Sequence, residues 1–180
     1  LLTASNYLQY FGSHVDISSD GNTIAISSSQ TNDDDYVQVY EFSANNWIQK
    51  VSNINKNSYD ILSIALADNA DAIAIGEIDG AYLLKFSEDW NQINQIVSSG
   101  ANDDFGYSIT IDENGDLFAV GAPSITTTNA NGYVTVYGIN ENYIQLCGDE
   151  IYGISYYDQL GNSVDTSHDG NIVSIGASGR

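Results

Sequence analysis

The sequence predicts an all-β fold, a β-propeller of four-stranded antiparallel blades, from three observations. One pattern occurs four times: an alternating stretch, a tight polar turn, and a second alternating stretch that ends in a small residue. The closing residues are Ser27, Gly76, Gly121 and Gly176, which lie 49, 45 and 55 residues apart. A strand-only repeat of this length is typical of propeller blades or a related array. No stretch keeps a 3.6-residue period for three turns, and the 13 Tyr, 5 Phe and 2 Trp favour strands.

The four polar turns lie at 19–22, 68–71, 113–116 and 168–171. Asp20-Gly21 is typical of a two-residue hairpin turn in which both central residues have positive φ. The strands that follow the turns read Thr-Ile-Ala-Ile, Ala-Ile-Ala-Ile, Leu-Phe-Ala-Val and Ile-Val-Ser-Ile. Such compact strands suit the crowded inner part of a blade.

The first blade is predicted over residues 11–55, after residues 1–10 that would end a preceding blade and connect to this one. Val15 and Ile17 lie two apart, which predicts that they share the buried face of the first strand. The remaining strands of this blade are expected at 23–27, 36–42 and 47–54.

Two further blades and a half blade follow. Residues 56–100 form a degenerate blade, in which Ile61 stands where the other copies carry Gly12, Gly106 and Gly161. Residues 101–155 form the fullest blade, and residues 156–180 supply only two strands of a fourth. The segment therefore holds about 3.5 blades. Its strands are expected at 62–66, 72–76, 81–86, 92–97, 105–111, 116–121, 132–139, 143–147, 161–166 and 171–176.

The charge is strongly negative, with 24 acidic against 4 basic residues and a formal net charge of −20. Such a surface repels phosphate backbones and anionic lipid headgroups, so we expect no nucleic-acid partner. No apolar run is long enough to span a bilayer, so we expect no direct membrane insertion. Cys147 is alone, and its neighbours Ile144 and Leu146 predict a buried apolar side chain.

Phe105-Gly106, residues 118–123 and residues 132–137 together resemble an FG-GAP repeat, the repeat of the integrin-α propeller and of many bacterial and algal surface proteins. Weaker copies begin at Phe11-Gly12 and Leu160-Gly161. The resemblance implies four-stranded blades in a ring of six or seven, and an extracellular or cell-surface protein that binds protein or glycan partners in adhesion. This segment cannot close such a ring alone, so open blade edges are available for self-assembly.

The resemblance also implies a possible calcium loop, Asp-x-Asp-x-Asp-Gly-x-x-Asp, between the first two strands of a repeat. The candidate ligands in this sequence are Asp16, Asp20, Asp112, Asp165 and Asp169. The last ligand position is apolar in these copies, as Ile24, Phe118 and Val173, whereas Ca²⁺ takes six to eight oxygens. We therefore expect plain hairpins and no firm calcium site.

Two groups of loop residues are candidates for partner binding. Asp33, Asp34 and Asp35 form an acidic run in the loop 30–35, and such runs are usually solvated. Tyr152, Tyr156 and Tyr157 cluster in the connection before the last half blade. Exposed aromatic side chains suit protein or sugar contacts, so we expect binding through these loops and the loop 124–131.

Catalytic patterns are weak, and the sequence predicts a protein that is not an enzyme. His14 is expected in a strand and His168 at a hairpin tip, and no Gly-x-Ser-x-Gly elbow occurs. The pair Asp103-Asp104 leaves open a carbohydrate-active propeller. A second alternative is a structural subunit of an extracellular filament or sheath, in which open edges pair between subunits.

Overall fold

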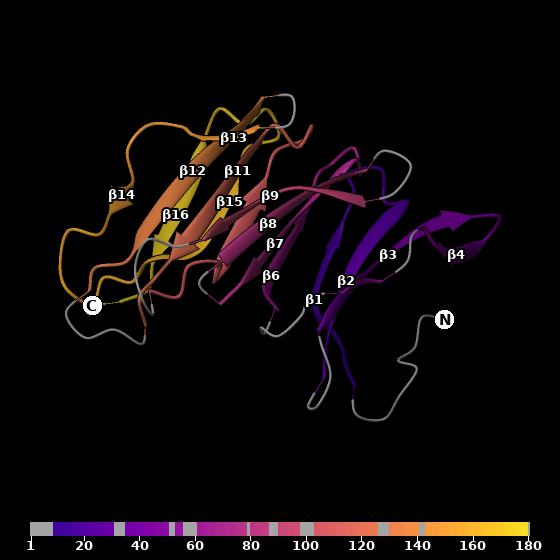
Figure 1. The fold of residues 1–180 in the computed structure, drawn as a ribbon, viewed down its shortest axis with the longest axis horizontal. Coiled ribbons are helices and arrows are strands. Elements are labelled where there is room, and N and C mark those ends of the chain that lie inside the picture. The colour runs from indigo at the N-terminus through magenta and orange to yellow at the C-terminus, as the bar shows by residue number, and fades with distance from the viewer. Residues whose placement is uncertain are drawn as a thin grey trace.

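A computed structural model describes residues 9–30, 35–50, 53–55, 61–78, 80–86, 90–97, 103–125, 130–140 and 143–179. These residues form strands and turns with no helix, which confirms the all-β prediction. Four antiparallel sheets follow one another in chain order. In Figure 1 the first sheet lies on the right, the second in the middle, and the third and fourth overlap on the left. Each sheet is one blade, and the fourth has two strands.

The strand order within each sheet is the chain order. The first blade holds β1 (Gln9–Ile17), β2 (Thr23–Gln30), β3 (Tyr36–Ser43), β4 (Asn46–Gln49) and β5 (Ile54–Asn55). The second holds β6 (Ile61–Leu66), β7 (Ala72–Glu77), β8 (Gly80–Phe86) and β9 (Trp90–Val97). The third holds β10 (Ser108–Ile111), β11 (Leu117–Ala122), β12 (Tyr133–Asn140), β13 (Tyr143–Leu146) and β14 (Ile151–Tyr152). The fourth holds β15 (Leu160–Thr166) and β16 (Val173–Ala177).

The predicted elements are found within a few residues of their expected bounds. The first strand begins at Gln9, so the last two residues assigned to a preceding blade belong to β1. The predicted outer strand of the first blade is two short strands, β4 and β5, and both pair with β3.

The first two strands of each blade form a hairpin, called the inner hairpin here. All four inner hairpins have the same type of turn, which contains more residues than the two-residue turn predicted at Asp20-Gly21. In the first hairpin, the Ser18 amide donates to the Thr23 carbonyl over 2.9 Å, and the Gly21 amide donates to the Ser18 carbonyl over 2.9 Å. Only one turn residue has positive φ, and it is Gly21, Ala70, Gly115 or Gly170 in the four copies. Glycine adopts this conformation without the steric penalty of a Cβ atom.

Three blades have a glycine with positive φ near the start of the first strand: Gly12 and Gly161 lie at bulges in β1 and β15, and Gly106 lies in the turn before β10. Gly12, Gly106 and Gly161 have φ of +88°, +96° and +91°. In the second blade, Ile61 pairs with Glu77 just as Phe11 pairs with Ser28. Ile61 therefore replaces the phenylalanine of the motif, not the glycine as predicted, and the second blade has a bulge that is one residue shorter.

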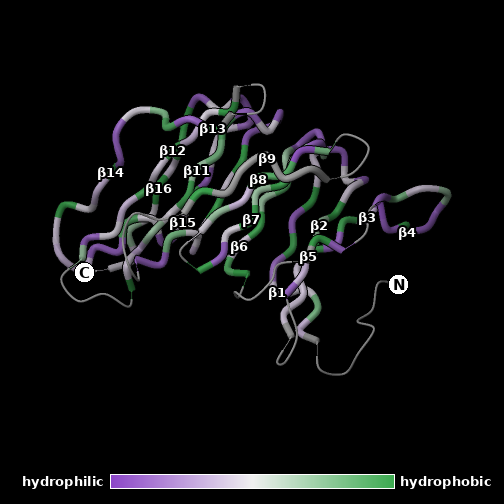
Figure 2. Tube along the Cα trace, in the orientation of Figure 1, coloured by the Kyte–Doolittle hydropathy of each residue, from purple (hydrophilic) through white to green (hydrophobic). Residues whose placement is uncertain are grey.

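Apolar side chains are buried between successive blades, as the green segments of the central strands in Figure 2 illustrate. Ile109, Phe118 and Val120 of the third blade share one buried cluster with Ala65 and Ala74 of the second. This burial is the main favourable contribution to stability.

Two burial predictions are wrong. Val15 and Ile17 are 55% and 51% exposed, because within the described residues no blade precedes β1 to cover them. Cys147 is exposed, because it directly follows β13, the strand at the edge of the third sheet.

Candidate functional site

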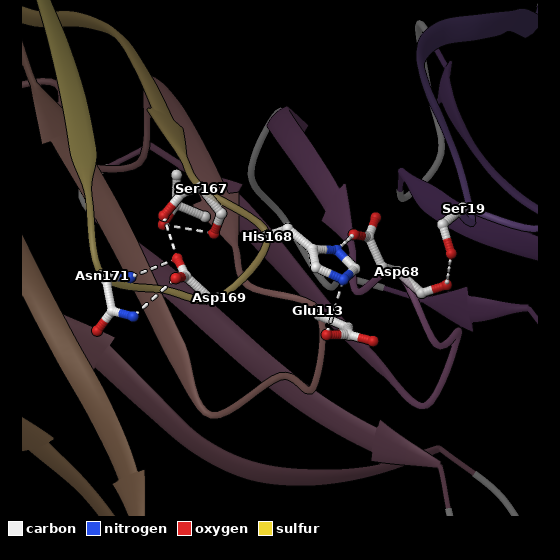
Figure 3. Close-up of polar contacts among 8 residues, drawn as sticks. Ser19, Asp68, Glu113, Ser167, His168, Asp169 and Asn171 are labelled. Carbon is white, nitrogen blue, oxygen red and sulfur yellow. Dashed lines mark hydrogen bonds and ion pairs between the residues drawn. The ribbon is translucent and has the colours of Figure 1, made fainter.

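The turns of the four inner hairpins lie in a row at one end of the blades. Main-chain hydrogen bonds link successive turns, from the Ser19 amide to the Asp68 carbonyl and from the Glu113 amide to the His168 carbonyl, over 3.2 and 3.1 Å. This stacking brings together four residues at equivalent repeat positions: Ser19, Asp68, Glu113 and His168, the tip cluster of Figure 3.

His168 bridges two acidic residues from two other blades. Its Nδ1 lies 2.5 Å from Asp68 Oδ2, and its Nε2 lies 2.9 Å from Glu113 Oε2 (Figure 3). The hydrogen bond with Asp68, followed by the charge of Glu113, raises the pKa of His168. Because both ring nitrogens are engaged, the imidazole offers no free nitrogen to a substrate in this arrangement.

The predicted calcium candidates Asp20 and Asp169 form the same network in two turns. Ser18 Oγ donates to Asp20 Oδ1 over 2.6 Å, and Ser167 Oγ donates to Asp169 Oδ1 over 2.7 Å. The side chains of Asn22 and Asn171 each donate to the second carboxylate oxygen. The hydroxyl of Ser167 and the groups of Asn171 lower the pKa of Asp169 to about 2.

The other three candidates also bind main-chain amides. Asp112 Oδ1 accepts from the Asp116 and Leu117 amides over 2.7 and 3.0 Å. Asp16 Oδ2 accepts from the Leu66 amide of the next blade over 2.6 Å, and burial is the main cause of its raised pKa. Asp165 Oδ1 accepts from the Thr166 amide over 3.0 Å.

The five aspartates come from three different hairpins, and each carboxylate contributes to the turn or strand of its own blade or the next. Within the described ranges, no group of three His, Cys, Asp or Glu side chains is placed to hold a metal ion.

The opposite end of the blades carries an exposed aromatic segment. β14 pairs with the start of β12, where Tyr133 lies opposite Tyr152, and this end of the sheet is remote from the turns. Tyr152, Ile154, Tyr156 and Tyr157 form the tyrosine surface, with exposed fractions of 60%, 97%, 65% and 52%. The tyrosines predicted for binding are therefore accessible.

Several contacts hold this segment in place. Asn131 Nδ2 donates to the Gly153 carbonyl over 2.8 Å, and the Tyr157 amide donates to the Ala130 carbonyl over 2.9 Å. The Tyr152 hydroxyl donates to Glu150, which raises the pKa of Tyr152. A pocket of about 480 Å³ lies beside Tyr157 and is also lined by Gln159, Ser178 and Gly179.

The structure describes only one of the three acidic residues predicted to bind a partner in the loop 30–35. Asp33 and Asp34 lie outside the described residues. Asp35 was predicted in a solvated loop, but it is buried, and its Oδ2 accepts from the Ile61 amide over 3.1 Å. Asp35 thus connects the first blade to the second.

The carboxyl pair considered for glycoside chemistry is also part of the blade framework. Asp103 is buried, its Oδ1 accepts from the Phe105 amide over 3.1 Å, and its Oδ2 accepts from the Tyr133 hydroxyl over 2.6 Å. Asp104 has φ of +59°, as in a turn. Because both carboxylate oxygens of Asp103 accept hydrogen bonds within the third blade, its contacts are those of a structural residue and not of a general acid.

Sequence reasoning missed one Ser–His contact. His14 Nδ1 lies 3.2 Å from Ser27 Oγ, and burial lowers the pKa of His14. The strand register could have revealed this contact, because the pairing of Val15 with Ile26 sets His14 opposite Ser27. Ser27 is 1% exposed, so its hydroxyl is closed to substrate.

No helix in the described part of the chain has the length and apolar character needed to cross a membrane. No family model matches the sequence, and no curated protein matches it. Solved structures do match.

Three similar structures have TM-scores of 0.60–0.61. Hydrazine synthase of Kuenenia stuttgartiensis is 11% identical, and the match covers 91% of this chain and 58% of that chain. A putative 6-phosphogluconolactonase of Bacteroides uniformis is 9% identical, with 89% and 46% covered. A functionally unknown protein of Desulfotomaculum acetoxidans is 22% identical, with 89% and 47% covered.

At these identities the likeness establishes the fold alone, and the chain has a β-propeller-type fold. The chain spans about half the length of the structures it matches. Two of the three neighbours carry enzyme names, but at these identities the names describe those proteins and not the activity of this chain.

Proposed function

We propose that this protein is a non-enzymatic propeller that binds a protein or glycan partner at the cell surface or outside the cell. The observation that carries the proposal is the tyrosine surface. Four large side chains of one short connection are more than half exposed, and one of them, Tyr157, lines a pocket of about 480 Å³. Tyrosine combines a large apolar ring with a polar hydroxyl, which suits recognition of proteins and sugars.

The side chains that could serve catalysis are engaged in framework contacts. His168 is held between Asp68 and Glu113, and Asp103 binds an amide and a hydroxyl. We further propose that the five hairpin aspartates shape their turns and do not hold calcium, because their oxygens accept from nearby amide and hydroxyl groups.

A glycan array tests the binding proposal, with the labelled chain and a Tyr156→Ser/Tyr157→Ser variant as probes. A Tyr10→Ser variant is the control, because Tyr10 is 66% exposed and lies on the first blade. We expect glycan signals that the double variant loses and the control keeps. Equal signals from all three proteins would contradict a role for the tyrosine surface.

The same variants test a protein partner by capture from a cell-surface fraction, where the partner should be retained by the control and lost by the double variant. A glycosidase assay tests the non-enzyme proposal. Turnover that disappears on Asp103→Asn, in a variant that unfolds like the wild type, would overturn it.

A further inference from the structure

Three large apolar side chains outside the tyrosine surface are also exposed at the ends of inner blades. Ile78, Tyr107 and Ile125 have exposed fractions of 42%, 38% and 43%. Ile78 belongs to the second blade and the other two to the third, and each of these blades contacts a blade on either side. Their exposure therefore lies at the end of the blades and not on an open side face.

Ile125 lies at the same end of the third blade as the tyrosine surface. It follows β11 and begins the loop to β12, whose first residue, Tyr133, pairs with Tyr152. The end of this loop binds the tyrosine segment, because Asn131 Nδ2 donates to the Gly153 carbonyl over 2.8 Å. One loop therefore links Ile125 to the exposed tyrosines.

Tyr107 and Ile78 lie at this same end, where the second and third blades meet. Tyr107 directly follows Gly106, whose amide donates to the Gly121 carbonyl near the end of β11. A Cβ atom at Gly106 would come within 2.3 Å of the Glu77 carbonyl oxygen, and Ile78 directly follows Glu77 in the turn between β7 and β8. The main chains beside Tyr107 and Ile78 are thus in contact. Together with the tyrosine surface, these three residues form the apolar end: Ile78, Tyr107 and Ile125.

The composition of the apolar end suits a protein partner better than a glycan. Ile78, Ile125 and Ile154 are exposed and carry no hydrogen-bonding side-chain group, whereas a sugar presents hydroxyls that need donors and acceptors. Aliphatic side chains gain free energy when they are buried against other apolar groups, and exposed apolar patches mark protein contacts. A glycan would use the tyrosine rings but leave these isoleucines without a favourable contact.

The charged groups beside the apolar end are acidic. Asp149 is exposed and Glu150 is partly exposed, and both directly precede β14. In the described part of the chain no Lys or Arg lies at this end: Lys85 binds Asp116 near the turns, and Lys50 packs over a ring at the far end of β8, also near the turns. With a formal net charge of −20, the chain attracts cationic groups and repels anionic ones.

We infer that the apolar end binds a protein whose contact surface combines apolar side chains with Lys or Arg. In this contact the isoleucines and tyrosines are buried against apolar side chains of the partner, and Asp149 and Glu150 pair with its cationic groups. The faces of the exposed tyrosine rings also attract such cations. The inference rests on the binding role proposed above, and it narrows the partner from a protein or glycan to a basic protein surface.

Fluorescence anisotropy with labelled synthetic peptides tests the chemistry of the partner. The peptides share the same Trp and Leu positions and carry Lys, Ser or Glu at all other positions. We expect the wild-type chain to bind the Lys peptide at least about tenfold more tightly than the Ser peptide, and to bind the Glu peptide most weakly. Added salt should weaken binding of the Lys peptide, because salt screens the attraction between exposed charges.

A pair of charge variants distinguishes local charge from the net charge of the chain. Asp149→Asn/Glu150→Gln should weaken binding of the Lys peptide at least about fivefold. Glu41→Gln/Asp71→Asn removes the same charge from two exposed residues near the turns, and it should bind within about twofold of the wild type. Equal losses from the two variants would show attraction by net charge alone and would overturn the inference.

A pair of isoleucine variants tests the apolar contribution and leaves the tyrosine surface intact. Ile78→Ser/Ile125→Ser should weaken binding of the Lys peptide at least about fivefold. Ile48→Ser/Ile172→Ser changes two exposed isoleucines outside the apolar end and should bind like the wild type. All four side chains are at least partly exposed, so circular dichroism should show folded variants.

Three results would overturn the inference: no binding of the Lys peptide, equally tight binding of the Glu peptide, or equal affinities of the two isoleucine variants. The Tyr156→Ser/Tyr157→Ser variant separates such a failure from a failure of the proposed function. Glycan-array signals that this variant loses would keep the binding role, with a glycan as the partner. Peptide binding and glycan signals that the variant keeps unchanged would contradict the binding role itself.

Discussion

The third and fourth inner hairpins have nearly the same sequence pattern and very different surroundings. Val120 and Gly121 of β11 are buried between blades, whereas Ile175 and Gly176 of β16 are partly exposed. Both hairpins have the same turn, a glycine with positive φ near the start of the first strand, and a serine opposite a glycine, Ser108 with Gly121 and Ser163 with Gly176. The local pattern therefore specifies the hairpin, and the neighbouring blade supplies the burial.

The largest difference is expected between equivalent isoleucines. Ile75 is fully buried, and Ile75→Ala should lower the free energy of unfolding by about 2–5 kcal/mol through lost burial and a cavity. Ile175→Ala should cost less than about 1.5 kcal/mol, because its site is already partly open. Urea unfolding measures both. Equal losses would contradict the difference in burial between these two sites.

The second comparison concerns two equivalent glycines, Gly121 and Gly176, which lie opposite Ser108 and Ser163. Gly121→Ala places a Cβ atom against the Gly161 carbonyl and should cost about 1–3 kcal/mol. Gly176→Ala lacks that neighbour and should cost less than about 1 kcal/mol. Both new methyl groups meet the serine of their own blade, so this shared effect cancels when the two variants are compared by urea unfolding.

The third comparison concerns two equivalent aspartates. Asp16→Ala leaves the Leu66 amide without its acceptor in a partly buried place and should cost about 1 kcal/mol. Asp165→Ala should change stability by less than about 0.5 kcal/mol, because Asp165 is exposed and binds only the amide next to it in the described structure. Thermal unfolding of the two variants distinguishes them, and a reversed order would show that the bond between blades contributes little.

The smallest expected effects are the pH dependences of the two histidines. The pKa of His168 is raised in the folded state, so its stabilising contribution is complete below pH 6.5 and disappears as the pH rises through the raised pKa. The pKa of His14 is lowered, so its contribution favours the folded state at higher pH and diminishes as the pH falls below 6.5.

Melting temperatures between about pH 5 and about pH 9 measure these contributions. His168→Gln and His14→Ser should change the pH profile in opposite directions, each by about 1–2 °C. Profiles that move in the same direction would contradict the contacts of His168 with Asp68 and Glu113.

The repeat spacing predicted the fold and nearly every strand, because alternation and turn residues act within one hairpin. The predictions of burial and solvent exposure were wrong where they depend on a neighbouring blade. Val15 and Ile17 alternate like buried residues but are exposed, because no blade precedes them within the described residues. Asp35 lies in an acidic run that is typical of a solvated loop, but it is buried and binds the Ile61 amide. The tip cluster was also beyond the sequence analysis, since it joins side chains from four turns that are close only after the blades stack. The exposed tyrosines were predicted because they belong to one connection.

Hydrogen exchange tests most directly whether stacked neighbours create the protection of each hairpin. The amides of β7 and β11, which are covered on both faces, should exchange slowest, and those of β15 and β16 should exchange much faster despite their similar sequences. Equal protection of β11 and β16 would contradict the account.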